Sequence, residues 1–269
     1  MTNTKNIIKN ILIISGKLLF VAFALVSMAF VNNEFKKKKV QNISIKIISE
    51  NNPMLCSVEE IENYIDKNNL QLIDKSYSEL NFYNIEKIIN EKNEVKSSAV
   101  YFTPDHQLYI EVKERKPIAR IFTNHINHYI DDEWKLFKVT KSYKVPLIMG
   151  ELYENPSIFK HYPIRKVLLS ENFSNSSLMD DVYLVTQSVL KDTTIQNFID
   201  YLYFTSNKEI EIYPVIGKFK VLVGNSEHFQ EKMNKLKLFI TQGLNKNDAW
   251  TKYSQINLKY KNLIYCTKK

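Results

Sequence analysis

Residues 95–117 carry the sequence VKSSAVYFTPDHQLYIEVKERKP, and this stretch decides the fold of the first half of the chain. Two strand-like runs, 95–103 and 107–114, flank the turn-forming sequence Pro-Asp-His. Apolar and more polar side chains alternate along the second run, which is the period of a half-buried strand. The stretch therefore predicts two neighbouring strands, with a boundary at Pro117.

The residues before this pair predict one more strand and two helices. Isoleucine alternates with polar residues over 43–47, as in a strand. Ser57 and Glu60 have the spacing of a capping box at a helix start, and residues 84–90 form a second short helical pattern. The order strand, helix, helix, strand, strand lets a helix pair cover a three-stranded sheet, so this block is expected to fold as a unit.

The chain after Pro117 predicts a second block, with a mixed set of strands and helices. One helix is expected to start at Ser177, and another is expected over residues 229–244. The predicted fold class of the whole chain is α+β. Strands are expected at 120–122, 128–130, 136–139, 145–150, 199–205, 209–213, 219–223 and 253–266.

Residues 11–31 form an apolar run of the length that crosses a bilayer. A retained anchor is favoured over a cleaved signal peptide, for which residues 27–29 would be the cleavage site, because the apolar run continues past that site. Lysines precede and follow the run in similar numbers, so charge alone leaves its orientation open. Residues 32–39 are expected to form a short polar tether.

Composition bounds the class of protein. The hydrophobic fraction is 44% and the charged fraction is 25%, as in a water-exposed globular protein with one span. The net charge is +8, but the lysines are spread along the chain and no nucleic-acid-binding motif lies among them. Cys56 and Cys266 lack metal or redox spacing. We expect two unpaired thiols, with a long-range disulfide as the alternative outside the cytoplasm.

Two groups of residues have the residue types of a reaction or metal site. His125 and His128 have a metal-like spacing near Asp131 and Asp132, but they fall in an expected hairpin, so surface histidines are favoured. The carboxylates of residues 131–133 lie beside an expected turn, where Asp commonly accepts hydrogen bonds from the backbone. No catalytic residue, metal or cofactor is therefore expected.

Four segments resemble the sequence pattern of the FtsQ/DivIB family, in the Bacteroidetes-like form. The expected strand ending in Glu114, followed by Pro117 and Ala119, is similar to the end of the family's POTRA domain. Trp134 departs from the pattern, because the family often has Gly in that turn. The other matching segments are 129–131 with Phe137 and 145–150, the segment 256–260 with Asn257 and Lys259 substituted, and the C-terminal residues 266–269.

The resemblance implies a single-span scaffold of the division machinery without catalytic activity. It implies a cytoplasmic tail (1–10), an inner-membrane anchor (11–31), a periplasmic POTRA domain (40–116) and a periplasmic β domain (117–269). Its partners would be FtsB, FtsL and other division proteins, with no nucleic acid and no small-molecule substrate. The alternative class is a cell-envelope enzyme or transport component that carries a POTRA-like adaptor.

The partner site implied by the resemblance lies near the C-terminus. Residues 253–266 are expected to form one edge strand, which would accept a strand from FtsB. Tyr260 matches the tyrosine that closes the family motif, and Leu258, Asn262 and Ile264 are candidates by position. The competing interpretation is that the lysines at 259 and 261 only guard the edge against random pairing.

Overall fold

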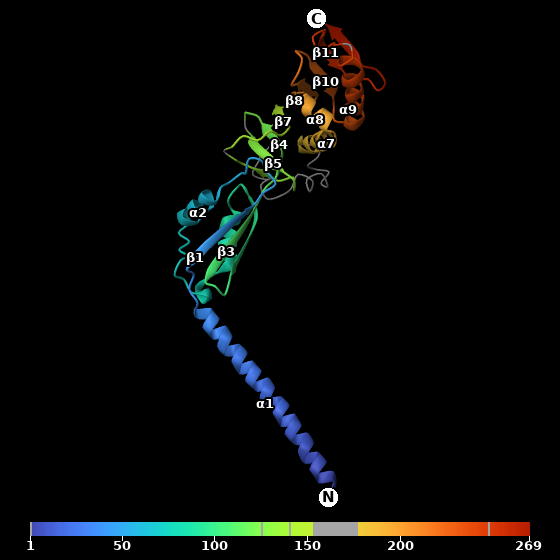
Figure 1. Ribbon diagram of the computed structural model, residues 1–269. Helices are drawn as coiled ribbons and strands as arrows, with labels where there is room; N and C mark the ends of the chain where they lie inside the picture. Colours follow the sequence, from blue (N-terminus) through green and yellow to red (C-terminus); the bar gives the residue numbers. More distant parts are fainter. Residues whose placement is uncertain (1, 125, 140, 153–176, 247) are drawn as a thin grey trace. The chain divides into compact units, whose positions relative to one another are not determined.

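Figure 1 shows the computed structural model, which describes residues 2–124, 126–139, 141–152, 177–246 and 248–269, with side chains from residue 15 onward. The chain folds into two compact units. The first contains Met1–Ile48 and Cys56–Glu114, and the second contains Ser49–Leu55 and Arg115–Lys269. The short segment Ser49–Leu55 thus leaves the first unit in mid-sequence to join the second.

The first unit contains a three-stranded sheet and two helices. Its sheet has the order β1-β3-β2, with β1 parallel and β2 antiparallel to β3. The expected order of strand, helix, helix, strand, strand is confirmed. The elements are β1 (Asn42–Ile48), α2 (Val58–Lys67), the 3₁₀ helix η1 (Tyr77–Glu79), α3 (Phe82–Asn90), β2 (Val95–Phe102) and β3 (Gln107–Glu114).

The predicted capping box begins α2. The Ser57 side chain accepts a hydrogen bond from the Glu60 backbone N–H at 3.2 Å, and the Glu60 carboxylate accepts one from the Ser57 N–H at 3.1 Å.

Just before this helix, the buried Glu114 carboxylate accepts a hydrogen bond from the Cys56 N–H at 2.8 Å and contacts the Cys56 thiol at 3.3 Å. Burial, together with this carboxylate, raises the pKa of Cys56 to about 12, so the thiol stays protonated. Cys56 and Cys266 are both free.

The core of the first unit follows the apolar spacing of the sequence. Alternate residues of β3 are fully buried, and each helix turns a pair of isoleucines toward them. This packing removes apolar surface from water and is the main stabilising term for such a small sheet. The residues concerned are Ile61 and Ile65 of α2, Ile85 and Ile89 of α3, and Leu108, Ile110 and Val112 of β3.

A single long helix, α1 (Thr2–Lys37), precedes the sheet of the first unit (Figure 1). Within the described residues, its part Ser15–Lys37 is the one helix long and apolar enough to cross a membrane, with a mean hydropathy of 1.7. Its large apolar side chains from Leu18 to Val31 are mostly exposed, so they contact little else in the chain. The helix is therefore a candidate single-pass anchor.

The expected polar tether at 32–39 is corrected, because α1 runs through it as far as Lys37. The Phe35 ring lies 5.0 Å from the Tyr77 ring and 5.8 Å from the Phe102 ring, both edge-on. Lys38 Nζ then donates to the Pro104 carbonyl at 2.6 Å. One aromatic side chain in an otherwise polar run gains buried contacts by docking, and this docking keeps the last turns helical.

The second unit is built on a nine-stranded mixed sheet of order β12-β11-β10-β9-β8-β7-β4-β5-β6. β7 is parallel to both of its neighbours and β10 is parallel to β11, while the other neighbouring pairs are antiparallel. The strands are β4 (Pro117–Phe122), β5 (Asn127–Asp131), β6 (Leu136–Phe137), β7 (Leu147–Gly150), β8 (Ile199–Phe204), β9 (Ile210–Pro214), β10 (Lys220–Gly224), β11 (Tyr253–Asn257) and β12 (Tyr265–Lys268).

Helices α7 (Met179–Leu190), α8 (Thr193–Phe198) and α9 (Phe229–Leu238) share one core with this sheet. The helix predicted over 229–244 begins where expected, but after Leu238 it continues as a π-helix, η2 (Phe239–Leu244). A Cβ on Gly243 would lie 2.9 Å from the Phe239 ring, so this glycine leaves room for that ring. Members of the core include Ile148, Val182, Val185, Val189, Leu202, Ile212, Val221, Met233, Leu236 and Ile256.

The single C-terminal strand expected over 253–266 is also corrected. β11 ends at Asn257, the chain reverses at residues 260–262, and β12 returns antiparallel to β11. Leu258 still packs in the core, but Lys259 to Leu263 are exposed, so no buried contact prolongs the strand. The edge of the sheet is therefore β12, not β11.

Candidate functional site

The C-terminal edge of the second unit is the strongest candidate site. β12 is the last strand of the sheet, and within the described residues it pairs only with β11. The backbone groups on its outer side can therefore pair with another extended chain. A lysine at 268 and a short length of four residues limit this edge, as is common for strands that must not pair at random.

The four residues predicted for this site separate into two pairs. Leu258 is 0% exposed, and its N–H donates to the Leu222 carbonyl at 2.8 Å. Ile264 is half-buried and packs against the same core. Tyr260, in contrast, is 54% exposed, and Asn262 is exposed in the turn. The structure thus leaves the Tyr260 and Asn262 side chains at the surface and directs Leu258 and Ile264 inward.

Two exposed apolar side chains that the sequence did not predict for this site lie beside Tyr260. Leu263 is 55% exposed and Tyr265 is 53% exposed. The Tyr260 and Tyr265 rings meet edge-to-face, with their centroids 4.9 Å apart. We call Tyr260, Leu263 and Tyr265 the C-terminal patch. The Lys-Asn pair at 261–262 is a turn signal that could have indicated the reversal and hence this grouping.

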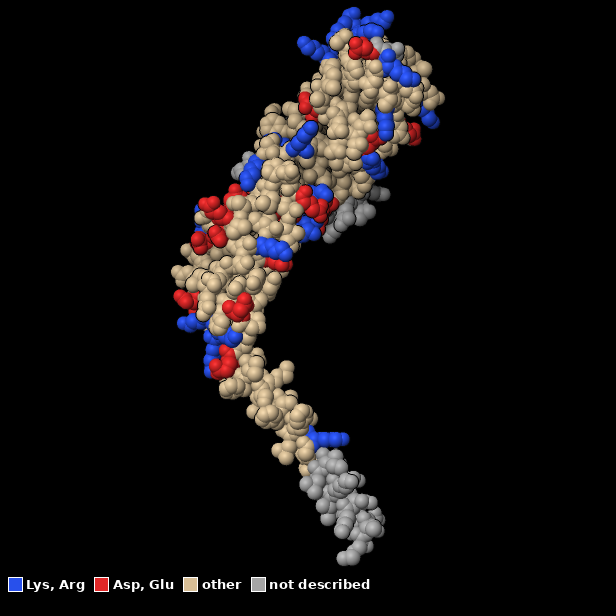
Figure 2. Space-filling view, in the orientation of Figure 1, with Lys and Arg blue, Asp and Glu red and all other residues tan. Residues whose placement is uncertain are grey.

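The lysines near the site have different surroundings. Figure 2 shows Lys and Arg side chains gathered at the end of the second unit that carries the C-terminus, where Lys252, Lys261, Lys268 and Lys269 are exposed. Lys259, one of the two lysines that the competing interpretation assigns to guarding the edge, forms an ion pair with Glu209 at 2.6 Å. Basic side chains therefore surround the edge, while Lys259 is engaged by the neighbouring hairpin.

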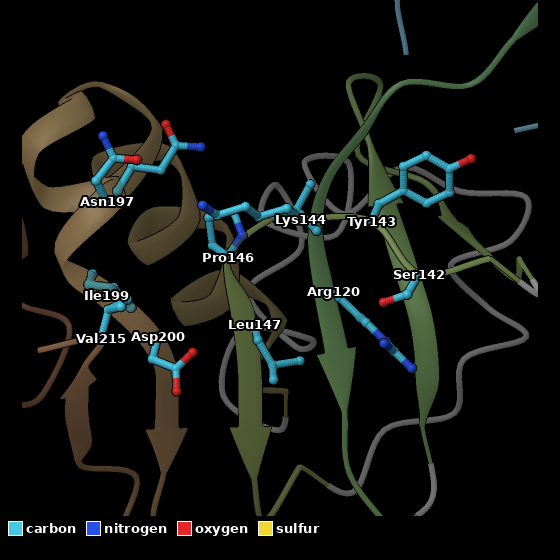
Figure 3. Close-up of a pocket in the computed structure, with 12 residues that line it drawn as sticks. Arg120, Ser142, Tyr143, Lys144, Pro146, Leu147, Asn197, Ile199, Asp200 and Val215 are labelled. Atoms are coloured by element: carbon cyan, nitrogen blue, oxygen red, sulfur yellow. The ribbon is translucent and has the colours of Figure 1, made fainter. Parts of the chain in front are cut away.

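A second candidate is a recess of about 410 Å³ at the ends of β7 and β8 (Figure 3). Arg120 and Asp200 are two of its charged residues, and Figure 3 shows Arg120 pointing away from Asp200, with Leu147 between them. The Arg120 guanidinium donates to the Asn127 side chain at 2.9 Å and lies over the Tyr129 ring at 5.3 Å. Its charge is thus held by neighbours rather than aimed across the recess.

The carboxylate cluster at 131–133 belongs to a turn, as the sequence indicated. Asp131 is fully buried and accepts the backbone N–H groups of Glu133 at 2.9 Å and Lys135 at 2.8 Å. Trp134 takes a left-handed φ of 66° in this turn, and its ring lies 4.1 Å from the Tyr183 ring. Glycine adopts that backbone conformation more easily, which explains why the family often has Gly there.

The histidine pair considered for a metal cannot be placed as a pair, because His125 lies outside the described residues. His128 is half-buried on β5, and burial, assisted by Lys138, lowers its pKa to about 4. A neutral ring is therefore favoured at this position. Among the described residues, no group of three or more His, Cys, Asp or Glu side chains could hold a metal ion.

The fold defines a class of protein in which a POTRA-like domain is followed by a second domain built on a mixed sheet. Residues 38–113 match the POTRA-like domain, and residues 116–267 match the family described as FtsQ/DivIB, C-terminal related. The second match covers more than half of the chain, so the chain belongs to the FtsQ/DivIB family of cell division proteins. A comparison with the curated proteins found no match.

Family membership confirms the resemblance in the sequence and sets the functional frame. The family is membrane-associated and consists of non-enzymatic division scaffolds. Interactions with other division proteins follow from membership in general terms.

Proposed function

We propose that this protein is a bitopic scaffold of the division machinery that carries no reaction of its own. One observation supports the partner site most directly: among the described residues β12 pairs on one side only, with β11, and its open edge lies beside the exposed C-terminal patch. Main-chain hydrogen bonds along an edge give affinity, and exposed aromatic side chains commonly dominate the energy of an interface. The partner proposed for this edge is FtsB, with FtsL bound in the same complex.

The proposed membrane arrangement places residues 1–10 in the cytoplasm and both folded units in the periplasm. The apolar helix supports a single anchor at 11–31 in the inner membrane. The proposed domains are a POTRA domain at 40–116, which recruits other division proteins, and a β domain at 117–269. No cofactor, nucleic acid or small-molecule substrate forms part of this proposal.

A binding experiment with purified components tests whether FtsB is the partner. The full chain in detergent micelles is titrated with the periplasmic segment of FtsB from the same organism, and binding is followed by fluorescence anisotropy. Saturable binding that an unrelated periplasmic peptide does not displace supports the proposal. Absence of binding at concentrations of about 100 μM, with the chain folded by circular dichroism, contradicts it.

Cell experiments test the role and the orientation. Depletion of the protein is expected to give chains of undivided cells, and a reporter active only outside the cytoplasm, fused after Lys269, is expected to be active. Normal division after depletion contradicts the scaffold role. A silent reporter on a stable fusion contradicts the orientation but leaves the partner experiment unaffected.

A further inference from the structure

One half-buried lysine of helix α9, Lys235, donates hydrogen bonds to the turn that carries Tyr260. Lys235 projects from α9, and the hydrogen bonds of its Nζ to described residues go to backbone carbonyl oxygens of the turn. The distances are 2.5 Å to Tyr260 O, 3.2 Å to Leu258 O, 3.3 Å to Leu263 O and 3.4 Å to Lys261 O. Four carbonyl oxygens thus converge on a single ammonium group.

The reason for this arrangement lies in the backbone of the turn. Residues 258–264 lie between β11 and β12 and outside both strands, so the ladder that pairs those strands does not satisfy their carbonyl groups. Carbonyl dipoles that point at one another repel unless a cation lies between them. An ammonium carries three donors and a full charge, which suits several convergent oxygens.

The same helix provides a lysine that differs in this one respect. Lys232 and Lys235 both line a small cavity of about 170 Å³ next to the turn. The Nζ of Lys232 binds the backbone carbonyl of Asn225 at 2.9 Å and the Asn225 side chain at 3.2 Å. Lys232 and Lys235 are therefore matched in type, helix and neighbourhood, but the bonds of Lys232 go to the loop between β10 and α9 rather than to the turn.

We propose that Lys235 is a positioning residue that holds the 258–263 turn in the conformation that displays the C-terminal patch. Its ammonium is not available to a partner, because the turn carbonyls occupy it. Its effect on binding, which rests on the proposed function, comes from preorganisation: a turn already ordered loses less entropy when a partner binds.

Hydrogen exchange of the full chain in micelles tests the structural part. Lys235→Met keeps the length of the side chain but removes the charge and the donors. Amides of residues 259–264 are expected to exchange at least about tenfold faster in this variant, with amides of the sheet unchanged. Lys232→Met is expected to leave the turn unchanged. Equal exchange in wild type and Lys235→Met, or an equal rise in both variants, overturns the proposal.

Binding of the periplasmic FtsB segment tests the consequence. Lys235→Met is expected to weaken binding about tenfold while Lys232→Met binds as wild type. If Lys235→Met loosens the turn but binds normally, a positioning role is overturned and a purely local structural role remains. If the wild-type chain does not bind the segment, the proposed function fails, and the exchange experiment still decides whether Lys235 holds the turn.

The experiment distinguishes unfolding of the Lys235→Met variant from a local change in the turn. Both tryptophans of the chain, Trp134 and Trp250, lie in the second unit, so their fluorescence reports its folding. Should Lys235→Met unfold that unit, the exchange measurement is taken on Lys235→Gln, which keeps a neutral donor. Fast exchange confined to the turn supports the proposal in that variant, and wild-type exchange contradicts it.

Discussion

Arg115 Nη1 lies 2.6 Å from Asp131 Oδ2, and the two residues form an ion pair in which Asp131 is fully buried. The other oxygen of Asp131 accepts two backbone N–H groups of the turn after β5. One carboxylate therefore connects the entry to β4 with the end of β5. A buried ion in this position depends on its partner, because an unpaired charge is costly to keep away from water.

We predict that Arg115→Met lowers the free energy of unfolding of the second unit by about 2–4 kcal/mol. The variant leaves the Asp131 carboxylate buried with only its backbone donors. Urea unfolding of the full chain, followed by the fluorescence of Trp134 and Trp250, measures this change in the second unit alone.

Lys116→Met is the matched control for that prediction. Lys116 pairs with Glu50 at 2.8 Å, but both side chains are more than half exposed. Removal of such a surface pair is expected to cost less than about 0.5 kcal/mol. Equal effects of the two variants would show that burial of Asp131 does not set the energy of the Arg115 pair.

We predict that Phe35 couples α1 to η1 and β2 within the first unit. Phe35→Ala removes the ring that packs against Tyr77 and Phe102, so the end of α1 should detach more often. Trypsin cleavage at Lys36 to Lys39 of the full chain in micelles is expected to become about tenfold faster, because cleavage follows the population of the open form.

The control for Phe35 lies on the same helix. Phe30 is 67% exposed and is not among the described side chains that pack on the core of the first unit, so Phe30→Ala is expected to leave the cleavage rate unchanged. Rapid cleavage of the wild-type chain at these lysines would contradict the docking of Phe35. If Phe35 docks as described, a span taken from another protein should preserve function only if the helix through Phe35 is kept.

We predict that Tyr260→Ala and Tyr265→Ala each weaken binding of the periplasmic FtsB segment by at least about 1 kcal/mol without unfolding the chain. The two exposed rings contact each other, so the double variant should lose less than the sum. Fluorescence anisotropy of the labelled segment measures binding. Tyr83→Ala, which changes a tyrosine 76% exposed in the first unit, is the control.

Leu258→Ala separates folding from binding at the same edge. Leu258 is fully buried, so its truncation is expected to cost about 2–4 kcal/mol of unfolding free energy in the second unit. A binding defect of this variant in proportion to its unfolded fraction agrees with a core role. Loss of affinity with unchanged stability would place Leu258 in the interface itself.

We predict that His128 makes the second unit less stable in mild acid. Its pKa is lowered from 6.5 to about 4, so the unfolded chain binds the proton more readily than the folded one. The contribution is complete above pH about 6.5 and is lost as the pH falls toward about 4. Because the ring is only half-buried, we expect a loss of about 1–2 kcal/mol rather than the full value of the shift.

Urea midpoints at pH about 7.5 and 5, again read from tryptophan fluorescence, measure this dependence. His128→Asn is expected to remove most of the difference between the two pH values that arises from this site. His228→Asn changes a histidine whose side chain is 70% exposed, and it should retain the wild-type difference. An unchanged pH dependence in His128→Asn would show that the ring titrates normally.

Local spacing in the sequence determined most of the elements of both units, but not the separate strands β11 and β12. The alternation at 107–114 identified β3 with its bounds, and Ser57 with Glu60 identified the start of α2. The apolar run predicted one membrane-spanning helix. These features are readable because each depends on residues within about one turn or one pleat of one another.

Tertiary structure decided the rest. The sequence could not show that Phe35 finds Tyr77, that Leu258 is the last buried residue before the reversal, or that Lys235 contacts the turn 25 residues later. Tyr260 and Leu258 fit one alternating pattern equally well, yet one is exposed and the other is in the core. The physical reason is that burial and hydrogen bonding of a turn depend on which distant segment packs beside it, and local spacing does not encode that choice.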